Sequence, residues 1–265
     1  MVTSSVPTAP GLEALRRSYS TALGMPVDFF IARDFAMLID AQATSRVEYA
    51  VYSATAYATA VELCQCVEPI AAPTDVDGAR GIRSILLARK GKMASVSDLP
   101  KIKTVAPPSD DISGSVAPFA LLSREGVLRD EAPFITVAPS AIEAENIFVK
   151  GEADALLGWE RISASGVAVL QGGTVDRLRR AGVDVGALDR IWASPVMPYG
   201  PHVVVKSLNA EAKTLLSEFL IGLHAADPQA YDLLSGGHSG GFVAVDDSAY
   251  APVHNIVRTM MLPDP

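Results

Sequence analysis

A polar turn between a short strand and a helical run is the stretch of this sequence best suited to holding a small ligand. The turn covers residues 109–115, Ser-Asp-Asp-Ile-Ser-Gly-Ser; an apolar strand at residues 103–106 precedes it, and a helical run at residues 116–124 follows it. Such a turn brings free backbone N–H groups and hydroxyls together at the start of a helix, which suits an anion or another small polar group. Aspartate and serine also cap helices without any ligand, and this stretch taken alone favours capping.

Carboxylate and aromatic side chains offer a second kind of binding chemistry. Asp111 is either the helix cap or a partner for a cationic group such as an amine. Trp159 and Glu160 directly follow a short expected strand at residues 153–157, so Trp159 could stack on a ligand and Glu160 could pair with an ammonium group. An ordinary half-buried tryptophan is an equally good interpretation of Trp159. Glu143 and Glu145 lie on an expected helix, where we expect solvated side chains.

The sequence offers no metal-binding cluster and no pair of carboxylates with a clear reason to lie close together. There is no H-E-x-x-H or C-x-x-C pattern, and the four histidines are scattered. We therefore predict a protein that is not an enzyme and that uses no cofactor and no metal. Cys64 and Cys66 are separated by one residue. Because a disulfide between them would close a strained small ring, we expect two thiols.

Strands and helices alternate along the chain, and they position these residues. Strands are expected at residues 26–31, 47–52, 64–72, 82–89, 103–106, 134–137, 153–157 and 202–205. Helices are expected at residues 11–23, 35–43, 53–62, 116–124, 140–149, 172–181, 210–225 and 250–261, with a further helix after Pro228. The alternation predicts an α/β fold with mostly parallel sheets flanked by helices.

Two extended segments, at residues 83–90 and 193–205, bracket the middle of the chain. If both are crossover strands, the middle section is a lobe inserted into the first one. We therefore expect lobe 1 to comprise residues 1–91 and 196–265, and lobe 2 to comprise residues 92–195. Two lobes joined by two hinge strands make a clamp, with the ligand in the cleft between them.

Composition narrows the class of protein and its partners. The 265 residues are 49% hydrophobic and 20% charged, which is typical of a soluble globular chain. With a net charge of −8 and no run of lysine or arginine, we expect no nucleic-acid partner. No apolar run reaches the ~18 residues that span a bilayer, so we expect no membrane insertion. The N-terminus lacks a signal-peptide pattern, so the protein is either cytoplasmic or periplasmic with a leader upstream of this start.

Taken together, several stretches resemble the phosphonate/phosphite-type solute-binding proteins of ABC transporters, which have the type II periplasmic-binding-protein fold. The likeness extends over residues 25–225. The stretches that carry it, in chain order, are EYAVYSATAY at 48–57, ILLARK at 85–90 with SDL at 97–99, DISG at 111–114, VKGEADA at 149–155 and WASPVMP at 192–198. The resemblance implies a two-lobed clamp of mixed or parallel sheets, with two hinge strands.

The resemblance implies ligand contacts in the first lobe at the end of one strand and the start of the next helix. Tyr52 and Ser53 occupy these positions and would point into the cleft, although a core tyrosine with a capping serine is an equal alternative. Phe35 stands where the family has a tyrosine in a first-lobe loop. Ser84 lies on the strand after Gly81, where a structural role is slightly favoured over ligand contact.

In the second lobe, the resemblance assigns the family's phosphonate oxygens to the hydroxyls of a Ser-Thr-Ser turn and to the adjoining helix N-terminus. Here Asp111 and Ile112 replace two of those residues, and Ser113 is retained. Gly114 and Ser115 keep their backbone donors, so Ser113, Gly114 and Ser115 are expected to contact the ligand. A carboxylate repels a nearby anion by ~1 kcal/mol in water, and by more where water is excluded. The ligand therefore need not be a phosphonate.

The function predicted from these observations is a monomeric solute-binding protein. It would capture a small polar molecule, phosphonate-like or amine-bearing, and deliver it to an ABC permease. One alternative is an enzyme on the same fold, similar to the pyrimidine-synthesis relatives of these proteins. Another is a cytoplasmic small-molecule sensor, although the sequence contains no helix-turn-helix or other output module.

Overall fold

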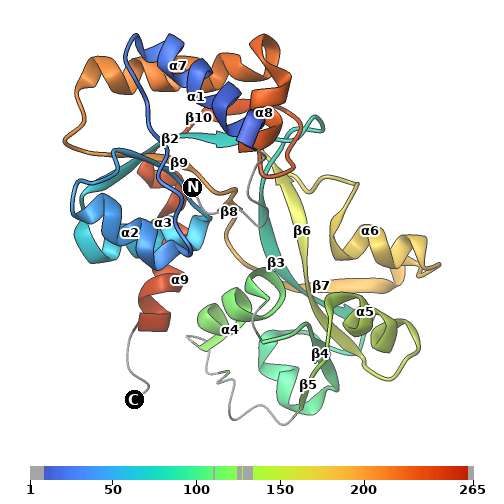
Figure 1. The fold of residues 1–265 in the computed structure, drawn as a ribbon. Helices are drawn as coiled ribbons and strands as arrows, with labels where there is room; N and C mark the ends of the chain where they lie inside the picture. The colour runs from blue at the N-terminus through green and yellow to red at the C-terminus, as the bar shows by residue number, and fades with distance from the viewer. Residues whose placement is uncertain (1–8, 110, 124–126, 128–133, 262–265) are drawn as a thin grey trace. The chain divides into compact units, whose positions relative to one another are not determined.

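The computed structural model describes residues 9–109, 111–123, 127 and 134–261, and they form two compact units (Figure 1). Unit 1 holds the described residues up to Arg80 and those from Met197 to Met261. Unit 2 holds those from Gly81 to Val196. The sequence analysis put the first boundary at residue 91, whereas the structure puts it after Arg80. The strand that begins at Ala79 belongs mainly to the sheet of unit 2, because it pairs there from Ile85 to Arg89.

Unit 1 combines six α-helices with short strands in the part of the chain that is described. Its helices are α1 (Ala9–Leu23), α2 (Phe35–Ala43), α3 (Ala54–Cys64), α7 (Ala210–Ala226), α8 (Pro228–Leu234) and α9 (Ala251–Met261), with the 3-10 turn η5 (Asp247–Tyr250). Its strands are β1 (Tyr49–Val51), β2 (Val67–Pro73), β8 (Met197–Pro198), β9 (His202–Val205) and β10 (Phe242–Ala244). The helix expected at 35–43 and the strand expected at 202–205 are confirmed with the same bounds.

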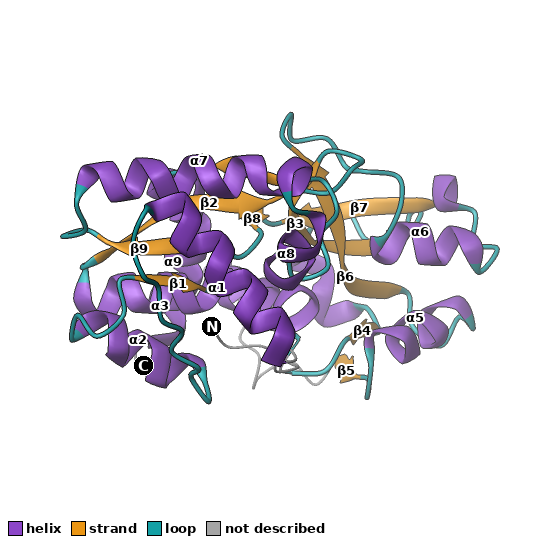
Figure 2. Cartoon of the chain, turned by 45° about the horizontal axis from the view of Figure 1, so that its top comes forward, coloured by secondary structure: helices purple, strands orange, loops and turns teal. Residues whose placement is uncertain are grey.

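The sheet of unit 1 has the strand order β1-β9-β2-β10, and every neighbouring pair is antiparallel. This corrects the expectation of mostly parallel sheets. β1 and β2 do run in the same direction and are joined through α3, as the alternation predicted. However, β9 arrives from the distant end of the chain and lies between them. Helices α1, α7 and α8 lie on one side of this sheet and α2, α3 and α9 on the other (Figures 1 and 2).

The segment at 26–31 is not a strand, although the sequence predicted one. Its apolar side chains instead pack on the core of unit 1, where Val27 and Phe29 contact the buried cluster that includes Leu15, Tyr19 and Leu220. Residue types that favour strands therefore pack on the core here without belonging to a strand.

Cys64 and Cys66 form a disulfide, which corrects the expectation of two thiols. The reason is local backbone geometry. Cys64 ends α3, and Gln65 follows in the left-handed conformation with φ +49°. This sharp turn brings the two Cα atoms to 5.0 Å, within the usual span of a disulfide. The ring is therefore small but compatible with an ordinary covalent bridge.

Unit 2 is built on a sheet with the order β5-β4-β6-β3-β7. Its strands are β3 (Ala79–Arg89), β4 (Thr104–Ala106), β5 (Ile135–Val137), β6 (Ala155–Ser163) and β7 (Leu188–Ala193). Its helices are η1 (Val96–Lys101), the π-helical turn η2 (Ile112–Val116), α4 (Ala117–Leu122), α5 (Ala141–Val149), α6 (Gly173–Arg180) and η4 (Val185–Ala187). β4 pairs in parallel with β5 and β6, whereas β3 and β7 are antiparallel, so the sheet is mixed.

Alternating burial along the strands gives unit 2 two cores, one on each face of its sheet. Leu86 and Leu157 pack with Leu122 of α4 on one face. The intervening residues Ile85 and Leu156 pack on the other face with the residues of α5 and α6. Because side chains alternate between faces, a residue's position along β3 or β6 determines which face it lies on.

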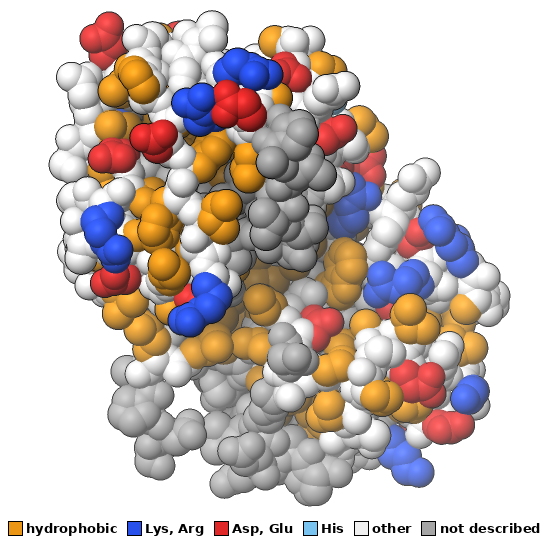
Figure 3. Space-filling view, viewed as in Figure 1, with side chains coloured by type: hydrophobic (Ala, Val, Ile, Leu, Met, Phe, Trp, Pro, Cys, Tyr) orange, Lys and Arg blue, Asp and Glu red, His pale blue; other side chains and the backbone are white. Residues whose placement is uncertain are grey.

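The surface drawn in Figure 3 mixes acidic and basic side chains among hydrophobic and neutral ones. Within the described part of the chain, no helix is both long enough and apolar enough to span a bilayer. The same residues contain no group of three or more histidine, cysteine, aspartate or glutamate side chains arranged to hold a metal ion.

Candidate ligand-binding site

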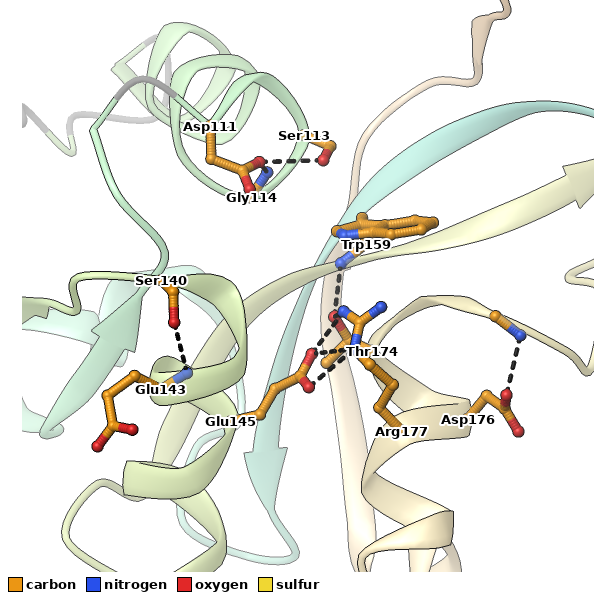
Figure 4. A network of polar contacts seen from close by, with 11 residues as sticks. Asp111, Ser113, Gly114, Ser140, Glu143, Glu145, Trp159, Thr174, Asp176 and Arg177 are labelled. Atoms are coloured by element: carbon orange, nitrogen blue, oxygen red, sulfur yellow. Dashed lines mark hydrogen bonds and ion pairs between the residues drawn. The ribbon is translucent and has the colours of Figure 1, made fainter. Parts of the chain in front are cut away.

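The candidate site lies where β4 and β5 end, beside the parallel strand β6, which continues beyond them to Ser163. Ala106 of β4 pairs with Val137 of β5, and Val105 pairs with Leu156 of β6. The segments that follow β4 and β5 therefore leave the sheet at the same edge, alongside the continuing part of β6. In open α/β sheets this carboxyl edge is the usual place for a ligand. The polar turn follows β4, and Trp159 lies on β6 beyond the end of β4 (Figure 4).

Asp111 caps the turn and accepts two hydrogen bonds through one carboxylate oxygen. Its Oδ1 accepts from the Gly114 N–H at 2.7 Å and from the Ser113 hydroxyl at 3.1 Å (Figure 4). These are two of the donors that the sequence resemblance assigned to an anionic ligand. The other oxygen, Oδ2, accepts no hydrogen bond from the residues that the structure describes. The turn therefore presents a carboxylate oxygen where the sequence resemblance predicted free hydrogen-bond donors.

The helical run after the turn begins earlier than the sequence predicted. Residues 112–116 form a π-helical turn that continues into α4, whereas the expected start was residue 116. The cause is the Asp111 cap, whose carbonyl accepts from the N–H groups of both Ser115 and Val116. Asp110 and the expected end of the helix at 124–126 lie outside the described residues.

Buried contacts beneath the turn fix its position. Ser84 is fully buried on β3, and its hydroxyl donates to the carbonyl oxygen of Ser113. Ser84 thus supports the turn from below. Ser115 is also fully buried. Gly114 lies so close to Pro107 that an added Cβ would be 2.5 Å from the proline Cγ. The turn is therefore fixed from below by β3 and packed closely against Pro107.

Replacing Gly114 by alanine is expected to lower the free energy of unfolding by about 1–3 kcal/mol. The rigid ring of Pro107 cannot rotate away from the new methyl group, so the backbone of the turn must shift. Chemical denaturation would measure the loss. Gly222→Ala on α7 is the matched control, because a Cβ there meets nothing within 4 Å. Equal stability of the Gly114→Ala variant and the wild type would contradict the close packing described here.

Trp159 is positioned by α6. Its backbone N–H donates to the Thr174 hydroxyl at 3.1 Å, and the Arg177 guanidinium carbon lies 5.2 Å from the centroid of its ring. Arg177 is held in turn by Glu145 of α5, with nitrogen–oxygen distances of 2.6–2.9 Å (Figure 4). This corrects the expectation that Glu145 is solvated: it is only 7% exposed. Glu145 and Arg177 come from separate helices, so no sequence spacing indicated the pair.

Glu160 lies on the opposite face of β6 from Trp159. The alternation of β6 puts Trp159 on the face of η2 and α4, and Glu160 on the face of α6. The Glu160 carboxylate accepts from Arg83 Nε at 2.5 Å and from Arg190 Nη2 at 3.0 Å. Both oxygens are thus already paired with guanidinium groups, and Glu160 joins β6 to β3 and β7.

Phe35, Tyr52 and Ser53 belong to unit 1 and form a group of their own. The rings of Phe35 and Tyr52 lie 6.1 Å apart, and Ser53 caps α3 by accepting from the Ala56 N–H at 3.1 Å. Tyr52 is 3% exposed, and its hydroxyl has no hydrogen-bond partner among the described residues. Burial raises the pKa of this phenol. Ligand contact by these three residues stays a prediction.

Solved structures with the same fold cover nearly the whole chain. The protein XAC2383 of Xanthomonas citri, bound to ATP, is 16% identical with a TM-score of 0.59, over 94% of this chain and 92% of that one. PhnD1 of Prochlorococcus marinus, in complex with methylphosphonate, is 13% identical with a TM-score of 0.52, over 98% of this chain and 96% of that one. Transferrin 1 of Manduca sexta is 11% identical with a TM-score of 0.61, over 96% of this chain and 45% of that one. These likenesses confirm the type II periplasmic-binding-protein fold. A comparison with curated proteins finds no match.

The family is established by a sequence comparison over most of the chain. A family model described as "ABC transporter, phosphonate, periplasmic substrate-binding protein" matches residues 3–250. Members of this family are transporter components that bind a solute and are not enzymes, which confirms the prediction of a non-enzymatic binding protein. Such a component implies two partners, a solute and a membrane permease. The chain belongs to the family of phosphonate-type periplasmic substrate-binding proteins of ABC transporters.

Proposed function

We propose that this solute-binding protein captures a small molecule that presents a hydrogen-bond donor, an ammonium group above all, to Asp111. The observation that carries the proposal is the pattern of hydrogen bonds at the turn. Ser113 and Gly114 both donate to Asp111 Oδ1, while Oδ2 accepts from none of the described residues. A carboxylate oxygen with free lone pairs at the carboxyl edge of a sheet is suited to a donor rather than to an anion.

A phosphonate would meet two obstacles at this turn. Two of the donors that could hold it, the Ser113 hydroxyl and the Gly114 N–H, already donate to Asp111. In addition, each unit of negative charge about 4 Å from the carboxylate would cost about 1 kcal/mol in water and about 4 kcal/mol at an effective dielectric constant of 20. A phosphonate nevertheless remains the second candidate, because the family model is phosphonate-type and Ser113 is retained. That candidate requires Asp111 to release Gly114 and Ser113.

The compartment proposed for this function is the periplasm. The family is periplasmic, and the Cys64–Cys66 disulfide fits an oxidising compartment. In that setting the protein would bind its solute outside the cytoplasmic membrane and deliver it to the permease.

Thermal unfolding in the presence of small solutes tests the proposal. The panel would contain matched amines, carboxylates and phosphonates of similar size, with benzylamine and methylphosphonate among them. A solute that binds only the folded protein raises its stability by RT ln(1 + [L]/Kd), so binding gives a saturable rise in the unfolding temperature. We expect stabilisation by amines and none by the anions. Stabilisation confined to the phosphonates would favour the second candidate and overturn the first.

Replacing Asp111 by asparagine is expected to weaken amine binding by about ten- to 150-fold, since a hydrogen bond to a charged group contributes about 1.5–3 kcal/mol. Asparagine is also a good helix cap, so the turn should keep its fold. Thermal shift with benzylamine would measure the loss. The control, Glu218→Gln, removes the same charge from an exposed position on α7. Equal losses in both variants would mean that general electrostatics, and not Asp111, attracts the amine.

A further inference from the structure

The Trp159 indole is held more firmly than an ordinary half-buried side chain. Thr174 is 1% exposed, and its hydroxyl accepts from the backbone N–H of Trp159, which fixes the strand that bears the indole. Helix α6 packs so closely on β6 that a Cβ at Gly158 would be 2.4 Å from the Thr174 hydroxyl oxygen. Arg177 lies against the indole and is locked by two hydrogen bonds from its Nε and one from its Nη2 to Glu145. Nothing in the proposed contact at Asp111 explains this support.

Trp159 also lies beside the turn that bears Asp111. The alternation of β6 puts the indole on the sheet face where η2 lies, and η2 contacts β6. In Figure 4 the indole lies between that turn and the side chains of Thr174 and Arg177. Ile112, which belongs to the turn, is 42% exposed. The turn thus carries an exposed aliphatic side chain, and the strand that η2 contacts carries an aromatic ring.

The charge of Arg177 decides what the indole can bind. A cation over one face of an aromatic ring is attracted by the negative face of its quadrupole. A second cation on the other face would gain less from a ring that Arg177 already polarises. A neutral planar ring, in contrast, still gains offset stacking and the burial of apolar area. The cationic part of a ligand is therefore directed to Asp111 and a flat, uncharged part to Trp159.

We infer that the solute is an amine that carries a planar aromatic ring, and that this ring stacks on the Trp159 face opposite Arg177. The inference rests on the proposed function, because it places the amino group of the same molecule at Asp111. Glu145 and Arg177 are positioning residues in this arrangement: they hold the indole and do not touch the ligand.

Benzylamine and cyclohexylmethylamine form the matched pair that tests the inference, since they share the aminomethyl group and differ in the flatness and aromaticity of the ring. Calorimetric titration should show benzylamine binding about tenfold more tightly to the wild type. Trp159→Leu should abolish that preference by weakening benzylamine alone. Trp159→Phe should retain it, which guards against a loss of fold in the leucine variant.

The outcomes separate this inference from the proposed function. Equal affinity of the wild type for the two amines, both weakened by Asp111→Asn, would overturn the stacking inference and leave the proposed function standing. No binding of either amine would overturn both. A preference for benzylamine that persists in Trp159→Leu would assign the ring to another part of the protein and also overturn the inference.

Discussion

Replacing Glu160 by glutamine is expected to lower the free energy of unfolding by about 3–5 kcal/mol, the usual cost of breaking a buried ion pair by removing one partner. The Glu160 side chain is 4% exposed, and the Arg83 side chain that it pairs with is 18% exposed. Glutamine keeps the shape of the side chain but leaves the Arg83 guanidinium largely out of water without a counter-charge. Arg190 is 43% exposed and therefore contributes much less to the loss.

Urea-induced unfolding followed by circular dichroism would measure this change. Glu152→Gln is the control, because Glu152 is exposed on the same unit and surface substitutions usually change stability by less than about 0.5 kcal/mol. Similar urea midpoints for Glu160→Gln and the wild type would show that the burial of the two arginines does not require the charge of Glu160. That result would reopen Glu160 as a residue free to bind an ammonium group.

Acid is expected to destabilise the protein well before its carboxylates are protonated, because of His202. Burial lowers the pKa of His202 from 6.5 to about 3. The folded protein therefore keeps this histidine neutral at a pH where the unfolded chain takes up a proton. The contribution of neutral His202 to the free energy of unfolding is fully present above pH 6.5, and it is lost as the pH falls toward 3. The loss is about 1.4 kcal/mol per pH unit, or about 2 kcal/mol between pH 6.5 and 5.

The environment of His202 explains why it resists protonation. It is 1% exposed, and its ring is 4.4 Å from that of Phe242. Its Nδ1 is hydrogen-bonded to the Tyr49 hydroxyl, which also accepts from the Tyr19 hydroxyl at 2.7 Å. With Tyr49 donating to Nδ1, Nε2 carries the proton and has no hydrogen-bond partner among the described residues. Burial also raises the pKa of Tyr49, so neither tyrosine can supply a counter-charge.

Unfolding free energies measured at several pH values between 7 and 5 test the role of His202. His202→Asn can still accept from Tyr49 but does not titrate, so its stability should depend less on pH than that of the wild type. The difference between the two slopes isolates His202 from the other histidines. Parallel curves for the two proteins would show that His202 does not cause the acid sensitivity.

Local chemistry explains how much of the fold could be predicted. The bounds of α2 and the caps of α3 and α5 follow from residues close in sequence: Asp34, Ser53 and Ser140 each accept from a backbone N–H three residues later. Such contacts are visible in the sequence because both partners lie within one turn. The insertion of β9 between β1 and β2 depends on residues more than 100 positions apart, and no local pattern encodes it.

At the candidate site, too, features formed by residues close in sequence could be predicted, whereas contacts between separate elements could not. The strand–turn–helix at 103–122 was predicted because its residues are consecutive. The two hydrogen bonds that commit Ser113 and Gly114 to Asp111 could not be predicted, since the sequence allowed both a cap and an anion site. The Glu145–Arg177 pair and the partners of Glu160 were also missed, because each joins separate elements of unit 2.

Calorimetric titration of benzylamine and methylphosphonate into the wild type and Asp111→Asn tests the central claim most directly. Asp111 Oδ2 accepts no hydrogen bond from the described residues, which predicts that benzylamine binds the wild type and binds the variant at least about tenfold more weakly. Methylphosphonate should not bind the wild type measurably and should gain affinity when the charge is removed. Tight binding of methylphosphonate to the wild type, unimproved in Asp111→Asn, would contradict the assignment of this turn to a donor-bearing solute.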